Sequence, residues 1–385
     1  MKKTWWVNSS QLDEDQRRVM SLPIEGKYLV EGPPGSGKTN LLALRAKYLL
    51  LSKRENFVII TFTKSLRSFL KFGLSAYGTQ RYDIYNYNQW AYNFLKEFGK
   101  PYPGSSDFKE TRNEIIEIIK DLISSNKGVS FYDTILVDEA QDYNSQEINI
   151  FNTLAKNLFL VADVKQTIFP GAEKNINHIK DIVDDSISLK YHYRNGFKIC
   201  DLADEVGQHP DSAKLINASQ YNEEESPSRV EEVKTSSLDE AFEIAYSNIE
   251  EQLEAFDGEN IGVIFPKKSV MEYFQDKLLG TPLYSKMAFH DSDHCIEFTS
   301  DTSVYGYVIH SAKGLEFRVV HMFGWDQDNM KGDFPRNRTY TAITRAKTIL
   351  FIYYTEKLHN YLKGALSKMN PIAPVDNLDI LLRSE

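Results

Sequence analysis

The chain has 385 residues, of which 42% are hydrophobic and 26% charged, and its net charge is −9, values typical of a globular protein with two or three domains. Two widely separated cysteines, Cys200 and Cys295, exclude a disulfide framework and a Cys-rich zinc site and fit a reducing cytoplasm. No apolar run is long enough to span a bilayer, and Lys2 and Lys3 precede no apolar signal core, so we expect a cytoplasmic protein without membrane contact.

Short apolar, β-branched runs alternate with helical stretches along the chain. Such continuous runs are typical of strands buried between helices, and the alternation predicts parallel sheets with right-handed crossovers. The runs form two groups, one before about residue 187 and one after about residue 258, so the sequence predicts an α/β fold in two parts. The expected strands are 28–30, 57–60, 134–137, 158–161, 261–265, 319–323 and 349–353.

A phosphate-binding loop follows the first expected strand. The segment Gly32-Pro33-Pro34-Gly35-Ser36-Gly37-Lys38-Thr39 fits G-x-x-x-x-G-K-[ST] and lies between a strand and a helical run. Its glycines allow backbone N–H groups to surround phosphate oxygens at a helix N-terminus. We expect Lys38 to reach the β- and γ-phosphates of ATP, and Thr39 to bind Mg²⁺.

Two carboxylates end the third expected strand, in Ile135-Leu136-Val137-Asp138-Glu139. A buried parallel strand delivers the residues at its carboxyl end into the nucleotide crevice. We therefore expect Asp138 to hold Mg²⁺, directly or through water. Glu139 is suited to orient and deprotonate the attacking water.

Seven motifs, in one order along the chain, resemble those of the UvrD/Rep-type superfamily 1 helicases. The resemblance covers nearly the whole chain and implies two RecA-like P-loop NTPase domains, at 1–187 and 188–385, with parallel sheets flanked by helices. The matching segments are 12–16, 61–64, 138–142, 162–169, 191–195, 310–317 and 340–346.

The resemblance assigns roles at the nucleotide and at a nucleic-acid strand. Gln16 would read adenine, Tyr193 would stack on it, and Glu316, beside Gly314, would contact the ribose. Gln166 would sense the γ-phosphate, and Arg194 and Arg345 would act as arginine fingers from the second domain. Hydrolysis would then require the two domains to close on ATP. The strand contacts implied by these motifs are Phe62, Thr63, Phe169 and His310.

The chain departs from the family pattern mainly in its nucleic-acid parts. Only a small insertion, at about 79–130, separates the second and third motifs, and its Trp90 suits either core packing or base stacking. The family's Trp-Arg pair after Phe169 is missing, His192 replaces an Asn, and Val308 replaces a Thr. Little room remains between Phe265 and His310 for a second insertion.

Residues 221–260 carry thirteen acidic and two basic side chains, which leaves the rest of the chain at +2. This segment fits a solvated helix face or linker, with a partner-docking surface as the alternative. As a whole, the sequence predicts an ATP-dependent translocase or helicase that moves 3′ to 5′ on single-stranded DNA, with RNA not excluded. The alternative is a nucleic-acid-sensing regulatory ATPase that gates a partner such as a nuclease in a bacterial defence system.

Overall fold

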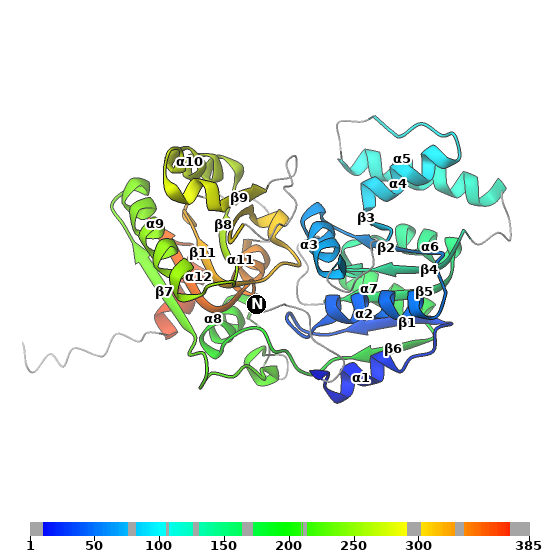
Figure 1. Cartoon of the computed structure of the whole chain (residues 1–385), viewed down its shortest axis with the longest axis horizontal. Helices are drawn as coiled ribbons and strands as arrows, with labels where there is room; N and C mark the ends of the chain where they lie inside the picture. Colours follow the sequence, from blue (N-terminus) through cyan, green and yellow to red (C-terminus); the bar gives the residue numbers. More distant parts are fainter. Residues whose placement is uncertain are drawn as a thin grey trace, which may run out of the picture.

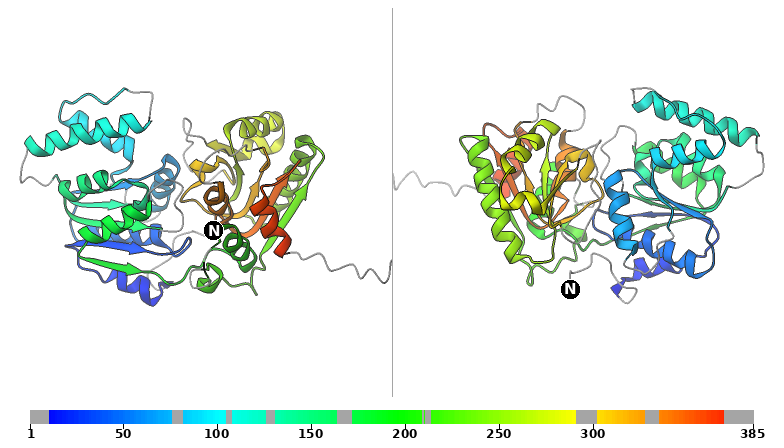
Figure 2. Two further views of the ribbon diagram at one scale, coloured as in Figure 1. Left: turned by 180° about the vertical axis from the view of Figure 1, so that it is seen from behind. Right: turned by 45° about the horizontal axis from the view of Figure 1, so that its top comes forward.

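The computed structural model contains two α/β bodies, each built on a six-stranded parallel sheet (Figure 1). Seen from behind and from above, the two bodies stay side by side (Figure 2). The predicted fold of two RecA-like domains with parallel sheets and flanking helices is confirmed. The structure describes residues 11–75, 82–104, 108–125, 131–163, 172–208, 210, 214–290, 302–327 and 335–369.

The first sheet has the strand order β3-β2-β4-β5-β1-β6, and every pairing in it is parallel. Its central strands are continuous apolar runs because helices cover both faces. Because all these pairings are parallel, the carboxyl ends of β1 and β4 lie at the same edge of the sheet. The strands are β1 (Lys27–Glu31), β2 (Phe57–Thr61), β3 (Ile84–Asn86), β4 (Tyr132–Val137), β5 (Ala155–Ala162) and β6 (Asp185–Ser188).

Local capping signals fix several helices of the first body. Asp13 and Gln16 form a reciprocal capping box at the start of α1, and Asn144 and Glu147 form another at the start of α6. The helices are α1 (Glu14–Met20), α2 (Lys38–Leu51), α3 (Lys64–Ser75), α4 (Tyr87–Glu97), α5 (Phe108–Ser125), the 3₁₀ turn η2 (Ala140–Asp142), α6 (Ser145–Leu154) and α7 (Ala172–Ile182). The small insertion thus contributes α4 and α5, which cap one end of the body (Figure 1).

The second sheet has the order β7-β12-β11-β8-β10-β9 and is also parallel throughout. Its strands are β7 (Arg229–Lys234), β8 (Ile261–Phe265), β9 (Met287–His290), β10 (Val304–Val308), β11 (Phe317–Met322) and β12 (Ala346–Tyr354). Its helices are α8 (Phe197–Gly207), η4 (Ile216–Ala218), α9 (Leu238–Ala255), α10 (Lys268–Leu278), η5 (Pro282–Lys286), η6 (Ile309–Ala312), α11 (Pro335–Ile343) and α12 (Asn360–Met369). Domain limits at residues 187 and 188 remain a prediction.

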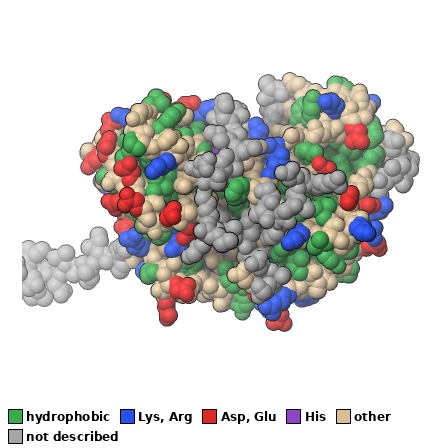
Figure 3. All heavy atoms as spheres, viewed as in Figure 1, with side chains coloured by type: hydrophobic (Ala, Val, Ile, Leu, Met, Phe, Trp, Pro, Cys, Tyr) green, Lys and Arg blue, Asp and Glu red, His purple; other side chains and the backbone are tan. Residues whose placement is uncertain are grey.

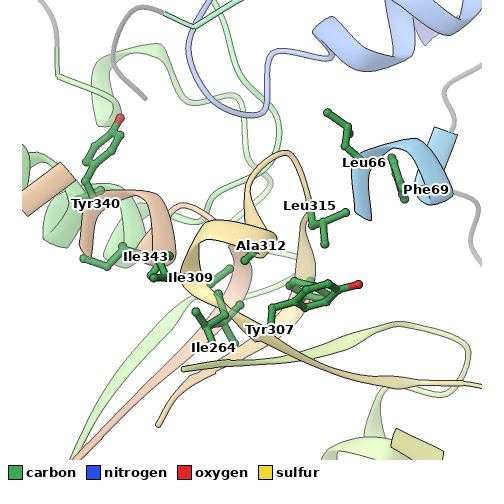
Figure 4. Close-up of a cluster of buried hydrophobic side chains, with 14 of the residues drawn as sticks. Leu66, Phe69, Ile264, Tyr307, Ile309, Ala312, Leu315, Tyr340 and Ile343 are labelled. Carbon is green, nitrogen blue, oxygen red and sulfur yellow. The ribbon is translucent and has the colours of Figure 1, made fainter. Parts of the chain in front are cut away.

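Apolar packing joins the two bodies. Leu66 and Phe69 of α3 belong to the same buried cluster as Leu315, which follows η6 of the other body (Figure 4). Gly314 has a left-handed φ of 81°, and a Cβ on it would come within 3.0 Å of the Leu66 methyl groups. The glycine therefore allows both the turn and the close approach of η6 to α3.

The acidic segment forms an edge strand as well as a helix. In the described part of the chain, β7 pairs with β12 alone, at the edge of the second sheet, and α9 follows it. Acidic side chains gather on the side of the molecule where α9 lies (Figure 3). The expectation of a helix face or linker alone was therefore incomplete. Charged residues on an edge strand discourage pairing with another chain. This strand is therefore charged and lacks the apolar run by which a buried strand is recognised in a sequence.

Among the described residues, the helices include none that is both long and apolar enough to cross a membrane.

Candidate nucleotide site between the domains

The phosphate-binding loop connects β1 to α2 through two left-handed glycines. Gly35 has φ 76° and Gly37 has φ 85°, and Gly37 caps α2 without any side-chain hydrogen bond. The first N–H groups of α2 therefore face the loop without a side-chain acceptor, as an anion site requires. A Cβ on Gly35 would lie 2.4 Å from Cβ of Arg194. The loop thus packs against the segment that carries the first predicted arginine finger.

Lys38 lies inside this loop. Its ammonium donates to the carbonyl oxygens of Gly32 and Pro33, both at 2.8 Å, and lies 3.6 Å from Oδ2 of Asp163. Burial lowers the pKa of Lys38, although Asp163 and Glu139 oppose that shift. Phosphate oxygens would supply this buried cation with anionic partners in place of the neutral carbonyls.

Asp138 lies at the end of β4 and is buried. Its Oδ1 accepts the backbone N–H of Glu139 at 2.8 Å, whereas its Oδ2 has no hydrogen-bond partner among the described residues. Burial and the neighbouring Glu139 raise the pKa of Asp138 to about 7, and the Thr39 hydroxyl partly offsets the shift. A buried carboxylate oxygen with no donor, next to a threonine hydroxyl, fits a divalent cation. In the described part of the chain, however, no group of three His, Cys, Asp or Glu residues could hold a metal alone.

Glu139 adopts a left-handed backbone conformation, with φ 53°, which costs energy for a residue with a side chain. Its Oε2 accepts a hydrogen bond from Nε2 of Gln141 at 2.5 Å and lies 3.8 Å from Nζ of Lys313. Burial by itself would raise the pKa of Glu139, but Lys313, Lys38 and Arg345 hold it below its usual value. These three cations therefore favour the ionised form of the Glu139 carboxylate.

The second body contributes two arginines to the same place. Arg194 pairs with Glu316, whose other oxygen lies 3.2 Å from Nζ of Lys347. Burial opposes ionisation of Glu316, yet Arg194 and Lys347 lower its pKa to about 2. Arg345 is buried and donates to the backbone oxygens of Thr341 at 3.0 Å and Leu315 at 2.8 Å. Both guanidinium groups are thus held in place by their own domain.

A cavity of about 340 Å³ lies between the two bodies and collects most of the predicted nucleotide residues. Gly32, Pro33 and Ser36 of the loop are not among the lining residues, and their carbonyl oxygens accept hydrogen bonds from Lys38 and Gln16. The predicted residues that line the cavity are Gln16, Gly35, Gly37, Lys38, Thr39, Asp138, Glu139, Tyr193, Arg194, Gly314, Glu316 and Arg345. The predicted nucleotide residues therefore meet in one cavity, although they span some 330 positions of the chain.

Of the two residues expected at adenine, Gln16 contacts the phosphate-binding loop and Tyr193 contacts the N-cap of α1. Gln16 is buried, and its Nε2 donates to the carbonyl oxygen of Ser36 at 3.0 Å. Tyr193 is 42% exposed, and its hydroxyl donates to Asp13 of the α1 capping box. His192, next to it, is buried and bonds the carbonyl oxygen of Leu215 at 2.9 Å, so it supports the fold of its own body.

One predicted contact with the nucleic-acid strand is corrected. Trp90 is 1% exposed, stacks on Phe94 and packs edge-on against Phe151 in the core of the first body. An aromatic ring enclosed in this way cannot stack on a base, so core packing is the role that the structure assigns. The apolar spacing of α4 explains the placement, because Trp90 lies on the helix face that includes Ala91 and Phe94.

The other residues predicted to contact the nucleic-acid strand differ in their surroundings. Phe62 is half-buried, with its ring edge-on to Tyr143 at 5.6 Å and the Arg112 guanidinium 5.6 Å from its centroid. The Thr63 hydroxyl accepts the N–H of Leu66 at 3.1 Å at the start of α3. His310 is exposed on η6. Gln166 and Phe169 lie outside the described residues.

Four residues of the site were given no role from the sequence: Gln141, Asp163, Lys313 and Lys347. Gln141 donates to Glu139 and accepts the N–H of Asp163 at 3.0 Å, so it ties β4 to β5. Lys313 donates to both oxygens of Asp142. Each of the four lies within or beside a matched motif, and that proximity is the only signal the sequence holds for them.

The sequence matches two family models, in the order expected along the chain. The UvrD/REP helicase N-terminal domain matches residues 12–100 and 79–185, and the UvrD-like helicase C-terminal domain matches residues 304–353. Together the matches cover more than half of the chain and include both the phosphate-binding loop and the second arginine.

Curated relatives share short segments with the chain. The mitochondrial ATP-dependent DNA helicase HMI1 of Saccharomyces cerevisiae is 33% identical over 91 residues, which is 24% of this chain and 11% of that protein. A probable DNA helicase II homolog of Mycoplasma genitalium is 36% identical over 104 residues, 23% of this chain and 14% of the relative. The chain thus corresponds to a small part of the length of these relatives.

Solved structures overlap with most of the chain at low identity. The PRRSV helicase covers 88% of this chain with 54% of its own, at 18% identity and a TM-score of 0.41. Arterivirus nonstructural protein 10, a helicase, covers 91% with 63% of its own chain, at 15% identity and a TM-score of 0.42. On the two family models, the chain belongs to the UvrD/Rep-type superfamily 1 helicases.

Proposed function

We propose that this chain is an ATP-driven motor that moves 3′ to 5′ along single-stranded DNA, in a reducing cytoplasm. The observation that carries the proposal is the cavity between the bodies, which Lys38 and Glu139 line from one side and Arg194 and Arg345 from the other. Catalytic groups divided in this way act together only when the two bodies are closed. We assign the two bodies to domains at 1–187 and 188–385.

The residues of the cavity suit phosphoryl transfer to water. That reaction needs positioning and charge neutralisation more than covalent chemistry. Lys38 and the N-terminus of α2 would bind the β- and γ-phosphates, and Arg194 and Arg345 would neutralise charge that develops during transfer. Glu139 would accept the proton of the attacking water. Both of its described contacts fall on Oε2, so Oε1 is the oxygen left for that proton.

Thr39 and Asp138 would hold Mg²⁺ together with the nucleotide. Magnesium commonly takes one or two carboxylates along with phosphate oxygens and water, which Asp138 and the nucleotide would supply. When bound, the ion neutralises phosphate charge. Gln16 and Tyr193 would bind adenine, and Glu316 the ribose, which requires Glu316 to exchange contacts with Arg194 or Lys347.

The strand-binding part of the proposal depends on Phe62, Thr63 and His310, with Phe169 in the same role. DNA is the substrate we propose, and RNA is the competing one. The deciding experiment measures ATP turnover alone and with single-stranded DNA, single-stranded RNA or duplex. Strong stimulation by single-stranded DNA supports the proposal, and stimulation by RNA alone would reassign the substrate. Turnover that no nucleic acid alters would contradict the motor.

The regulatory alternative makes a different prediction. A sensor that gates a nuclease or another partner would bind a strand and hydrolyse ATP without moving. Translocation is measured by the ATP-dependent displacement of streptavidin from a biotinylated end of the strand. DNA-stimulated hydrolysis without displacement from either end would favour the sensor over the motor.

A further inference from the structure

A lysine of the second domain reaches the acidic residues that follow β4 in the first. Lys313 follows η6, and its side chain is 1% exposed. Its ammonium donates to the two oxygens of Asp142, at 2.7 and 2.6 Å, and lies 3.8 Å from Oε2 of Glu139. The Asp142 side chain is fully buried. The ammonium is therefore anchored to one carboxylate and adjacent to the proposed general base.

The backbone around Lys313 is fixed against the first domain. The left-handed turn at Gly314 lies against Leu66, and Leu315 joins the apolar cluster of α3. Burial of the Lys313–Asp142 ion pair costs desolvation energy, which close hydrogen bonds must offset. The buried ammonium of Lys313 is therefore stable beside Asp142 only while the two domains are together. Opening of the domains would withdraw the lysine from both carboxylates.

The position of Lys313 affects one oxygen of Glu139 selectively. Gln141 and Lys313 both approach Oε2, and the left-handed backbone of Glu139 is held between β4 and η2. With Oε2 held by these two contacts, rotation of the carboxylate would be restricted and Oε1 would keep one orientation. A general base needs such an orientation, because proton transfer requires hydrogen-bond geometry with the water.

We propose that Lys313 is the positioning residue through which domain closure orients Glu139 for hydrolysis. The inference rests on the proposed function, since it takes Glu139 as the base. It predicts a loss of turnover rather than of ATP binding when Lys313 is removed. A second role for the same lysine would be a simple latch that neutralises Asp142 and holds the domains together.

Three variants distinguish positioning from latching: Lys313→Met, Asp142→Asn and the double variant. In Lys313→Met, Asp142 stays buried without its cation, so closure itself suffers. The double variant replaces both charges with neutral side chains, which removes the buried unpaired charge and allows the domains to close. Lys277→Met is the control, because it breaks an exposed lysine–aspartate pair with Asp239 in the same domain.

The experiment measures kcat and KM for ATP in the full chain with saturating single-stranded DNA, and binding of a fluorescent ATP analogue. If Lys313 orients Glu139, the double variant binds ATP within about threefold of wild type, but its kcat stays on the order of 10²-fold lower, the scale for a misplaced catalytic group. The Lys277→Met control keeps both parameters. Wild-type kcat in the double variant would show a latch and overturn the inference alone. A wild-type chain without ATP turnover would overturn the proposed function as well.

Discussion

Glu139 and Lys38 lie in the same cavity, but their loss is expected to affect different steps. Glu139→Gln preserves the shape of the side chain and its contact with Gln141, but an amide cannot accept the proton of water. We expect ATP binding near wild type and a kcat lower by about 10²- to 10⁴-fold, the usual contribution of a general base. Lys38→Ala should instead weaken binding. Equilibrium binding and turnover of both variants are the measurements, with Glu254→Gln on the exposed face of α9 as control. Normal hydrolysis by Glu139→Gln would refute the base assignment.

Phe62 is the aromatic side chain that we expect to bind a nucleic-acid strand. Tyr143 and Arg112 hold its ring, which remains half-buried at the surface of the first domain. Stacking is worth roughly 1–3 kcal/mol per base, so Phe62→Ala should weaken single-strand binding by about five- to 150-fold. ATP binding without DNA should not change. Fluorescence anisotropy with a labelled oligonucleotide tests this, and an unaltered affinity would assign Phe62 to packing.

At the scale of elements, β11 carries a buried histidine, and we expect it to make the stability of the second domain depend on pH. His321 bonds Oε1 of Gln252 in α9 at 2.8 Å and the hydroxyl of Tyr353 in β12 at 2.9 Å. Burial lowers its pKa to about 3. The unfolded chain therefore binds a proton below pH 6.5 that the folded chain does not, and stability is lost as pH falls from 6.5 toward 3.

The expected loss between pH 7 and pH 5 is about 2 kcal/mol from this group. Urea unfolding at both values should show a decrease for wild type that exceeds the decrease for His321→Gln by that amount. His359→Gln, an exchange outside the buried core, is the control. Equal pH dependence in wild type and His321→Gln would mean that the histidine is protonated in the folded chain.

The strands that the sequence predicts and those it misses differ in how they are covered. All seven expected strands lie within or overlap β1, β2, β4, β5, β8, β11 and β12, whose runs are apolar. β3, β6, β7 and β9 lie at sheet edges, where one neighbour suffices and the runs are short or polar. β10 is internal but contains Gly306, where a Cβ would lie 2.6 Å from the Phe289 ring. That close packing is set by the partner strand and is invisible in a local pattern.

Site residues could be predicted where a motif holds side chains that the reaction requires. They could not be predicted where only the fold brings together two residues that are far apart in the sequence. Lys38, Glu139 and Arg345 stand out because phosphate transfer requires those groups in those contexts. Trp90 suited a core and a stacking surface when taken as a single aromatic residue, and only its spacing with Ala91 and Phe94 on one helix face favours the core. Nothing in the residues beside Lys313 shows that its ammonium reaches Asp142.

At the scale of the whole molecule, we expect strong DNA-stimulated ATP turnover and weak strand separation by the monomer. Movement needs two closing domains and two strand contacts, whereas unwinding needs a further surface that holds or splits the duplex. In the described part of the insertion, α4 buries Tyr87, Trp90 and Phe94 and leaves Tyr92 exposed, so we expect that surface to be small. The test is strand displacement on a 3′-tailed duplex at limiting protein.

A partner, or a second copy, should increase unwinding by supplying the duplex contact, and the acidic segment 221–260 is our candidate docking surface. Complete unwinding by the monomer would contradict this expectation.

The contact of α3 with Leu315 has a thermal consequence. Leu66 lies against the turn at Gly314 and shares a buried cluster with Leu315, so opening of the domains would transfer apolar surface into water. Such exposure raises heat capacity by about 0.45 cal/K/mol for each Å² of apolar area. If ATP binding closes the domains, its enthalpy should become steadily more negative on warming, and Leu66→Ala should flatten that slope. Isothermal titration calorimetry with a non-hydrolysable analogue at several temperatures would then record how much apolar surface one cycle of the motor hides and reveals.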